Sequence, residues 1–126
     1  MYLGINMIFP ALKNGTIPNA INIPNTWLLK NNTLYFHKLD KLEEILNYAG
    51  IKRQSNIISF CNAGLESALS WFVMSELLKY PDNKLYESSL AEWSKYSDLP
   101  MTYRINIDYD ELKINEDDGF SMKPSN

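Results

Sequence analysis

Cys61 is the residue of this chain whose surroundings best suit it for chemistry. The stretch 56–60 is short, apolar and β-branched, as expected of a strand buried in a parallel sheet, and Cys61 follows it directly. Ligands of open parallel sheets bind beyond the carboxyl ends of the strands. A loop with Gly64 comes next, and a helical pattern begins at Leu65, so loop amides and the helix dipole are expected to stabilise a thiolate or a bound persulfide. Cys61 is therefore predicted to be a nucleophile.

The same position also suits a small buried hydrophobe, which is the role of most lone cysteines. Cys61 is the only cysteine of the chain and His37 the only histidine. A disulfide within the chain, a redox pair of cysteines and a structural zinc site are therefore excluded, and neither a metal nor another cofactor is predicted. His37 precedes a predicted helix without a partner cysteine, so we expect a surface or capping role for it.

Strands and helices are expected to alternate along the chain. The expected elements are a strand over 20–23, a helix over 39–49 ended by Gly50, a strand over 56–60, a helix over 65–80, a strand over 84–86 and a short helix around Trp93. The helix over 65–80 is apolar on most sides, which is typical of a buried helix, and its core residues are expected to include Trp71, Phe72 and Met74. Ser89 and Glu92 have the spacing of a capping box at the start of the last helix. This order predicts an α/β fold.

Composition and charge limit the partners of the chain. Its 126 residues are enough for one domain, and the net charge of -3 with a pI near 5.1 offers no basic stripe for nucleic acid. No apolar run approaches the roughly 18 residues of a membrane span, and the start of the chain lacks the pattern of a signal peptide. The chain as it stands is expected in the cytoplasm, or in the periplasm if an upstream signal peptide is missing.

Four segments resemble the rhodanese (sulfurtransferase) domain family. The segment 15–24, GTIPNAINIP, is similar to the family's strand entry, and 61–66, CNAGLE, is similar to its six-residue active-site loop. The segment 85–93 resembles the strand and Trp-bearing helix that follow the loop, and the pair 99–100 resembles the usual ending. The order of the four segments makes the resemblance specific.

The resemblance implies a sulfurtransferase. Its cysteine takes a sulfane sulfur from a donor such as thiosulfate, holds it as a persulfide and passes it to cyanide or a thiol. Cys61 is then the catalytic nucleophile. The implied substrate-binding groups are the loop backbone amides of Asn62, Ala63, Gly64, Leu65 and Glu66. The alternative is a rhodanese-like binding or regulatory module without catalysis, whereas a cysteine phosphatase is set aside because Ser67 stands where that chemistry needs an arginine.

The resemblance also implies a three-layer rhodanese-like fold with a mostly parallel sheet flanked by helices, here lacking the first strand and helix of the family. The expected domains are a rhodanese-like domain over 1–100, short at its N-terminus, and a C-terminal extension over 101–126 whose last ten or so residues form a mobile tail. A sheet without its edge strand exposes unpaired backbone groups, so we expect a possible homo-oligomer that covers this edge. The other expected partners are the small sulfur donor and acceptor.

The chain departs from the family pattern at three places. Residues 5–7 lack the family's usual Asp-x-Arg pair, Thr16 replaces a histidine, and Glu66 replaces a basic or hydroxyl residue. A Glu66 carboxylate turned toward the cysteine would oppose a thiolate and a dianionic donor by roughly 3 to 4 kcal/mol at 4 to 6 Å in an effective dielectric near 20. A carboxylate turned to water would still interact favourably with the helix dipole. The outward orientation is the one expected, and Trp93 is expected to pack against its own helix.

Overall fold

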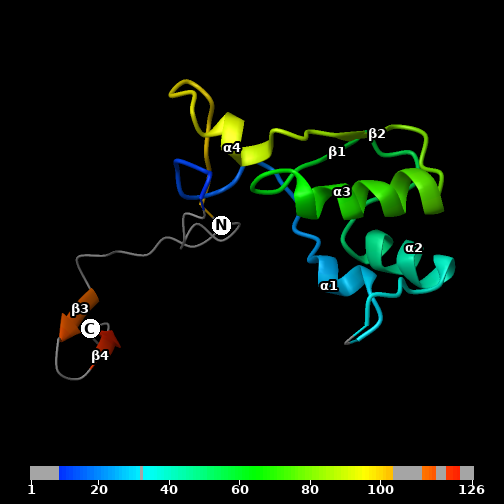
Figure 1. The fold of residues 1–126 in the computed structure, drawn as a ribbon, viewed down its shortest axis with the longest axis horizontal. Coiled ribbons are helices and arrows are strands. Elements are labelled where there is room, and N and C mark those ends of the chain that lie inside the picture. Colours follow the sequence, from blue (N-terminus) through cyan, green and yellow to red (C-terminus); the bar gives the residue numbers. More distant parts are fainter. Residues whose placement is uncertain (1–8, 32, 104–111, 116–118, 123–126) are drawn as a thin grey trace.

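The computed structural model describes residues 9–31, 33–103, 112–115 and 119–122 (Figure 1). The elements in chain order are α1 (Asn25–Leu28), α2 (Leu39–Tyr48), β1 (Ile57–Ser59), α3 (Leu65–Phe72), the π-helical segment η1 (Val73–Leu77), β2 (Asn83–Leu85), α4 (Ser89–Trp93), β3 (Leu112–Asn115) and β4 (Gly119–Met122). Helices and strands alternate from α2 to α4, which confirms the predicted α/β class. No helix in these ranges has the length and hydropathy needed to cross a bilayer.

The sheet that carries the site is formed by β1 and β2. The two strands are parallel, with Ile57 opposite Asn83 and Ser59 opposite Leu85, and α3 with η1 makes the crossover between them. Figure 1 shows α1, α2 and α3 on one side of this pair. Successive residues of a strand point to opposite faces, and Ile58 is 60% exposed on the face away from the core. Within the described residues β2 is the only strand beside β1, so coverage of the other edge by a second copy stays a prediction.

A buried apolar cluster holds the helices together on the covered side of the sheet. Its members are Leu28, Leu42, Leu46, Val73, Met74, Leu78 and Tyr80. The helix α2 ends as predicted, because Gly50 adopts a φ of 88° and its N–H donates to the Asn47 carbonyl at 3.0 Å. The Ile51 N–H donates to the Leu46 carbonyl at 2.9 Å, which completes the cap.

The helical segment predicted over 65–80 is less buried than its composition indicated. Met74 is in the core as expected, but Trp71 is half-buried and Phe72 is 40% exposed, stacked on Phe36 with 6.0 Å between ring centroids. Leu65 is 82% exposed. The reason is that α3 packs against the sheet and α1 on one side and meets solvent on the other.

The stretch 20–23 was predicted to be a strand, and this prediction is wrong. Residues 20–23 are not part of a strand, and the nearest β-type backbone pairing before them is an isolated bridge between Thr16 and Thr102. Pro18 and Pro24 flank the stretch and have no N–H to offer to a neighbouring strand. The segment is instead irregular, and it forms one wall of the cavity described below.

The C-terminal region contains regular structure where the sequence predicted a tail. The strand β4 pairs with β3 in an antiparallel ladder, with Leu112 opposite Met122 and Ile114 opposite Phe120. The sequence signal for this pair is the alternation of apolar and polar residues along each of the two strands, which is typical of β-structure. Residues 116–118 and 123–126, which the tail prediction also covered, lie outside the described residues.

Candidate active site

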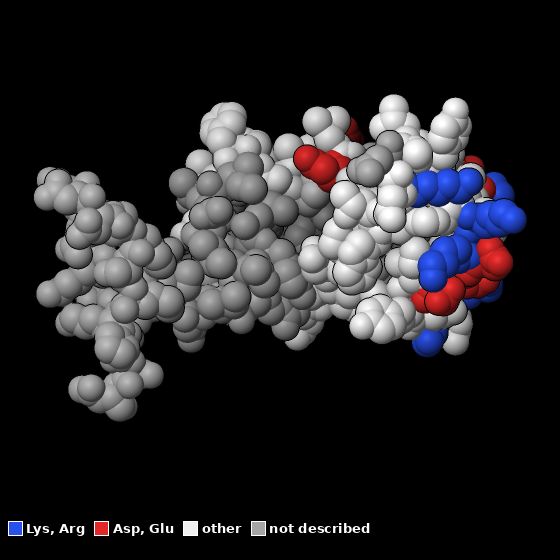
Figure 2. All heavy atoms as spheres, turned by 90° about the horizontal axis from the view of Figure 1, so that it is seen from below, with Lys and Arg blue, Asp and Glu red and all other residues white. Residues whose placement is uncertain are grey.

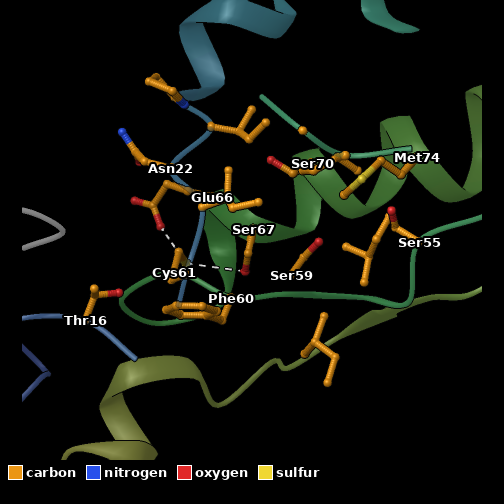
Figure 3. A pocket seen from close by; sticks show the side chains of 18 of the residues that line it. Thr16, Asn22, Ser55, Ser59, Phe60, Cys61, Glu66, Ser67, Ser70 and Met74 are labelled. Carbon is orange, nitrogen blue, oxygen red and sulfur yellow. Dashed lines mark hydrogen bonds between the residues drawn. The ribbon is translucent and has the colours of Figure 1, made fainter. Parts of the chain in front are cut away.

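Cys61 lies directly beyond the carboxyl end of β1, as predicted, and is 8% exposed (Figure 3). Two backbone hydrogen bonds hold the start of its loop against the α4 segment. The Leu90 N–H donates to the Cys61 carbonyl at 3.2 Å, and the Ala91 N–H donates to the Asn62 carbonyl at 2.9 Å. The sulfur atom is therefore carried by a backbone that is anchored on two sides, by the sheet and by α4.

Ser89 orients the backbone of Cys61, a role that its predicted place in a capping box did not suggest. Its Oγ accepts a hydrogen bond from the Cys61 N–H at 3.0 Å and donates to the Tyr86 carbonyl at 2.8 Å. Ser89 is fully buried and has a φ of 51°. The capping-box prediction is wrong because both side chains have other partners, Ser89 the Cys61 amide and Glu92 the Tyr86 hydroxyl.

The Tyr86 and Glu92 pair is short, with 2.6 Å between the phenol oxygen, which donates, and the carboxylate oxygen. Burial of the phenol and this carboxylate raise the pKa of Tyr86 to about 12. Tyr86 therefore remains a neutral donor throughout the physiological pH range. The bond fixes the turn between β2 and α4, from which the Tyr86 carbonyl accepts the Ser89 hydroxyl.

Gly64 supplies the amide that contacts the sulfur. Its N–H donates to Cys61 Sγ at 3.0 Å, and it begins α3 in a left-handed conformation with a φ of 93°. A side chain at this position would collide with the Glu87 backbone carbonyl, which lies against the Gly64 α-carbon. Both the backbone angles and the close approach require glycine here.

Ser67 brings a hydroxyl to the other side of the sulfur. Its Oγ lies 3.5 Å from Cys61 Sγ and donates to the Gly64 carbonyl at 3.1 Å. Ser67 is 4% exposed, in the first turn of α3. The same hydroxyl thus touches the sulfur and stabilises the loop that surrounds it.

The Glu66 carboxylate points toward the sulfur, which corrects the expectation of an outward side chain. Cys61 Sγ donates its thiol hydrogen to Glu66 Oε2 at 3.1 Å, and Figure 3 shows the carboxylate above the sulfur. The hydrogen bond from the thiol and one from its own backbone N–H hold the pKa of Glu66 below its usual range, although burial opposes this. These two donors are the physical reason for the inward orientation, and the side chain otherwise remains exposed to water.

The remaining loop residues support the site indirectly. The side-chain amide of Asn62 donates to the Phe9 carbonyl at 2.8 Å, which ties the loop to the start of the described chain. The contacts of Cys61 Sγ within the described residues are with Gly64, Glu66 and Ser67. Binding of an outer sulfur atom by the backbone amides of Asn62, Ala63, Leu65 and Glu66 stays a prediction.

A cavity of about 610 Å³ opens beside the sulfur. One wall is the segment 19–25, the other is β1 with its flanking residues, and Cys61, Glu66 and Ser67 lie at one end of it. The volume falls within the range of small-molecule sites, roughly 300 to 1,000 Å³. Thr16 lines the cavity, whereas His37 and Trp93 do not. The Trp93 indole N–H instead donates to the Pro100 carbonyl at 2.9 Å, and its packing against its own helix stays a prediction.

The structure places the predicted residues Cys61 and Gly64 in contact, whereas the contacts of Ser67 and Ser89 with Cys61 were not predicted from the sequence. The catalytic role of Cys61 stays a prediction. The sequence signal for Ser67 is its place three residues after Gly64, in the first turn of the predicted helix. Nothing local points to Ser89, which lies 28 positions beyond Cys61 in the chain. No group of three or more His, Cys, Asp or Glu side chains that could hold a metal occurs in the described part of the chain.

Two proteins of sulfur metabolism are similar in sequence to this chain over most of its length. It is 35% identical over 92 residues to the sulfur carrier protein TtuD of Thermus thermophilus, which covers 72% of this chain and 32% of that protein. It is 33% identical over 92 residues to the 3-mercaptopyruvate sulfurtransferase of Escherichia coli strain K12, which covers 73% of this chain and 32% of that enzyme. The chain thus spans about a third of the length of these relatives.

Solved structures share the fold. The Tum1 protein of Saccharomyces cerevisiae superimposes with a TM-score of 0.66 at 21% identity, covering 83% of this chain and 37% of that chain. A persulfide-bearing EanB variant with ergothioneine gives a TM-score of 0.72 at 21% identity, covering 83% of this chain and 26% of that chain. The family model described as the rhodanese-like domain matches residues 9–96. The chain therefore belongs to the rhodanese-like domain family and has its α/β fold, with a parallel sheet and flanking helices.

Proposed function

We propose that this domain is a sulfurtransferase module that carries sulfane sulfur as a persulfide on Cys61. The observation that carries the proposal is the position of Cys61 Sγ, which accepts the Gly64 N–H at 3.0 Å at the start of α3 and adjoins a cavity of about 610 Å³. Amide donors and the positive end of a helix stabilise a sulfur anion. The names of the relatives, a sulfurtransferase and a sulfur carrier, support the same chemistry.

Cys61 supplies the nucleophile, and the Gly64 amide stabilises its sulfur anion. The Cys61 thiol loses its proton to water, because a carboxylate with a lowered pKa such as that of Glu66 is a poor base. The thiolate attacks the outer sulfur of a donor such as thiosulfate, a bond forms between Sγ and that sulfur, and sulfite leaves with the electron pair of the broken bond. In the second half, cyanide or a thiolate attacks the outer sulfur and Cys61 leaves as a thiolate.

The experiment is intact-protein mass spectrometry after incubation with saturating thiosulfate or ethanethiosulfonate. We expect an increase by one sulfur atom that cyanide reverses. The Cys61→Ser variant, whose hydroxyl fills nearly the same space, should gain nothing. A parent protein that gains no sulfur from either donor, or a gain that survives in Cys61→Ser, contradicts the proposal.

The second candidate is a rhodanese-like module that binds without catalysis. The specific observation in its favour is the Glu66 carboxylate, which places a negative charge 3.1 Å from the sulfur. The mass measurement separates the two candidates, because a purely binding module would keep an unmodified Cys61 with both donors.

A further inference from the structure

Charge in the cavity comes from one side chain. Glu66 is the only Asp, Glu, Lys, Arg or His residue among the described residues that line it. The polar part of the lining is otherwise made of neutral amides and hydroxyls, for example Asn19, Asn22, Asn25, Ser59 and Ser70. A ligand in this cavity therefore meets hydrogen-bonding groups along its length and a full negative charge at the cysteine end.

The cations of the described part of the chain lie elsewhere. Figure 2 shows the Lys and Arg side chains of one face gathered at the end of the molecule where α2 lies. Several of these cations already have carboxylate partners: Lys41 with Glu44 at 3.1 Å, Arg53 with Glu43 at 3.0 Å, Lys79 with Glu76 at 3.5 Å and Lys84 with Asp82 at 3.3 Å. None of them lines the cavity, so no described cation offsets Glu66 there.

The Glu66 carboxylate is ionised at neutral pH, because even the ordinary glutamate pKa of about 4.3 lies well below it. The thiol and the backbone amide that it accepts from hold its pKa below the usual range, so it carries its charge at neutral pH. It contacts Sγ itself, so a donor that brings its outer sulfur to Sγ must bring the atoms attached to that sulfur near the carboxylate as well. Each negative charge on those atoms raises the free energy of approach, and a positive charge lowers it.

We propose that Glu66 makes this site selective for sulfur donors that carry a positively charged group, such as an aminoalkyl group, close to the transferable sulfur, and selective against dianionic donors such as thiosulfate. The inference rests on the proposed function and specifies its substrate class. An ammonium group within reach of Glu66 Oε2 would form an ion pair there, while neutral amides and hydroxyls of the cavity bind the remainder of the donor. The bonds formed and broken in the sulfur transfer are the same as for the reaction with thiosulfate.

The test uses three thiosulfonate donors that share the reacting group and differ in the charge of the substituent next to it. They are 2-aminoethanethiosulfonate, ethanethiosulfonate and 2-carboxyethanethiosulfonate, with net charges of about 0, -1 and -2 at neutral pH. In each, the Cys61 thiolate attacks the outer sulfur, the bond between the two donor sulfurs breaks, and its electron pair leaves with the sulfinate. The rate constant of persulfide formation on Cys61 is measured by quenched mass spectrometry at low salt. Each rate constant is divided by that of the same donor with 2-mercaptoethanol, a neutral thiol, which removes intrinsic differences in reactivity.

We expect the corrected rate constants to fall from the amino to the ethyl to the carboxy donor, by roughly threefold or more for each unit of charge. The differences should shrink in 0.5 M salt because screening weakens exposed charges. The variant Glu66→Gln should flatten the series. The matched control Glu76→Gln removes a carboxylate from η1, away from the cavity, and should keep the order of the parent.

Equal corrected rate constants in the parent, or a preference for the carboxy donor, overturn the selectivity while leaving the proposed function intact. A charge order that persists unchanged in Glu66→Gln assigns the selectivity to another group and overturns the role of Glu66. A parent protein that accepts sulfur from none of the three donors contradicts the proposed function itself, and the inference with it. The parent series needs no variant, so a poorly folded Glu66→Gln would not remove the test.

Discussion

The hydroxyl of Ser89 accepts the backbone N–H of Cys61 at 3.0 Å, across 28 positions of sequence. This bond sets the direction of the chain as it leaves β1, because the same hydroxyl donates to the Tyr86 carbonyl at the end of β2. The nucleophile is thus positioned by the side chain of the first residue of α4, the helix that follows the neighbouring strand. The carboxyl ends of both parallel strands contribute to the site.

Ser89→Ala should destabilise the domain by about 1 to 3 kcal/mol, since it leaves a buried backbone N–H without an acceptor. For a domain of this size that corresponds to a drop of several degrees in the thermal midpoint. Circular dichroism melting measures the effect. The control is Ser75→Ala, which removes a partly exposed hydroxyl that donates to the exposed Glu76 side chain, and it should change the midpoint little. Equal midpoints for the two variants would contradict the role of Ser89.

Gly64→Ala should cost more stability than Gly50→Ala. Both glycines have a positive φ, 93° and 88°, so both substitutions strain the backbone by about 1 to 2 kcal/mol. A Cβ at Gly50 meets nothing within 4 Å, whereas one at Gly64 collides with the Glu87 carbonyl. Urea denaturation measures the free energy of unfolding of both variants, and the difference between them is the cost of the steric collision at Gly64. The rate of Cys61 labelling by iodoacetamide should change only in Gly64→Ala. Equal losses of stability in the two variants would mean that the loop shifts to avoid the collision without destabilising the domain.

The pKa of Glu66 should rise toward its ordinary value in Cys61→Ala, because the thiol hydrogen bond is the largest cause of its lowering. Carbon-detected NMR titration of the side-chain carboxyl measures this shift. A lowered carboxyl pKa contributes stability that is present above the unfolded-state pKa and is lost as pH falls through the folded-state pKa. In the parent, the stabilisation from this interaction should therefore begin to fall once the pH drops below the ordinary glutamate pKa, and it should be lost as the pH falls through the lowered folded-state pKa. An unchanged pKa in Cys61→Ala would show that the contact is not formed in solution.

Glu66→Arg should raise the rate constant for sulfur transfer from thiosulfate at low donor concentration by roughly 5- to 30-fold, since it exchanges a repulsive charge for an attractive one. The gain should shrink with added salt and should appear in KM before kcat. Steady-state kinetics with cyanide as acceptor measure both parameters. An unchanged rate at low salt, with the persulfide still formed, would contradict the inward orientation of Glu66.

Removal of the residues after Asn115 should leave the thermal midpoint of the rhodanese-like domain within a few degrees of the parent. Among the described strands, β4 pairs with β3 alone, so its loss breaks no ladder of the β1 and β2 sheet. Calorimetry of the shortened chain and of the parent measures the two thermal midpoints. A larger fall, equivalent to more than about 1 kcal/mol, would mean that the C-terminal region packs on the domain.

The local part of the site could be predicted from sequence. An apolar strand, Cys61, Gly64 and the start of a helix follow one another within ten positions, and their order alone places a sulfur at a helix N-terminus. The cap at Gly50 and the apolar face of α2 were equally predictable, because their hydrogen bonds and contacts join residues a few positions apart.

The tertiary structure alone decided which partners the side chains around Cys61 meet. Ser89 and Glu92 have the spacing of a capping box, yet the Cys61 amide and the Tyr86 hydroxyl, brought near by the sheet, are their partners. Glu66 has two orientations of similar merit in an isolated helix, and the thiol hydrogen of Cys61 selects the inward one. The physical reason is the same in both cases. A local pattern lists the hydrogen bonds a side chain can make, and the folded chain determines which competing partner lies within hydrogen-bond distance of it.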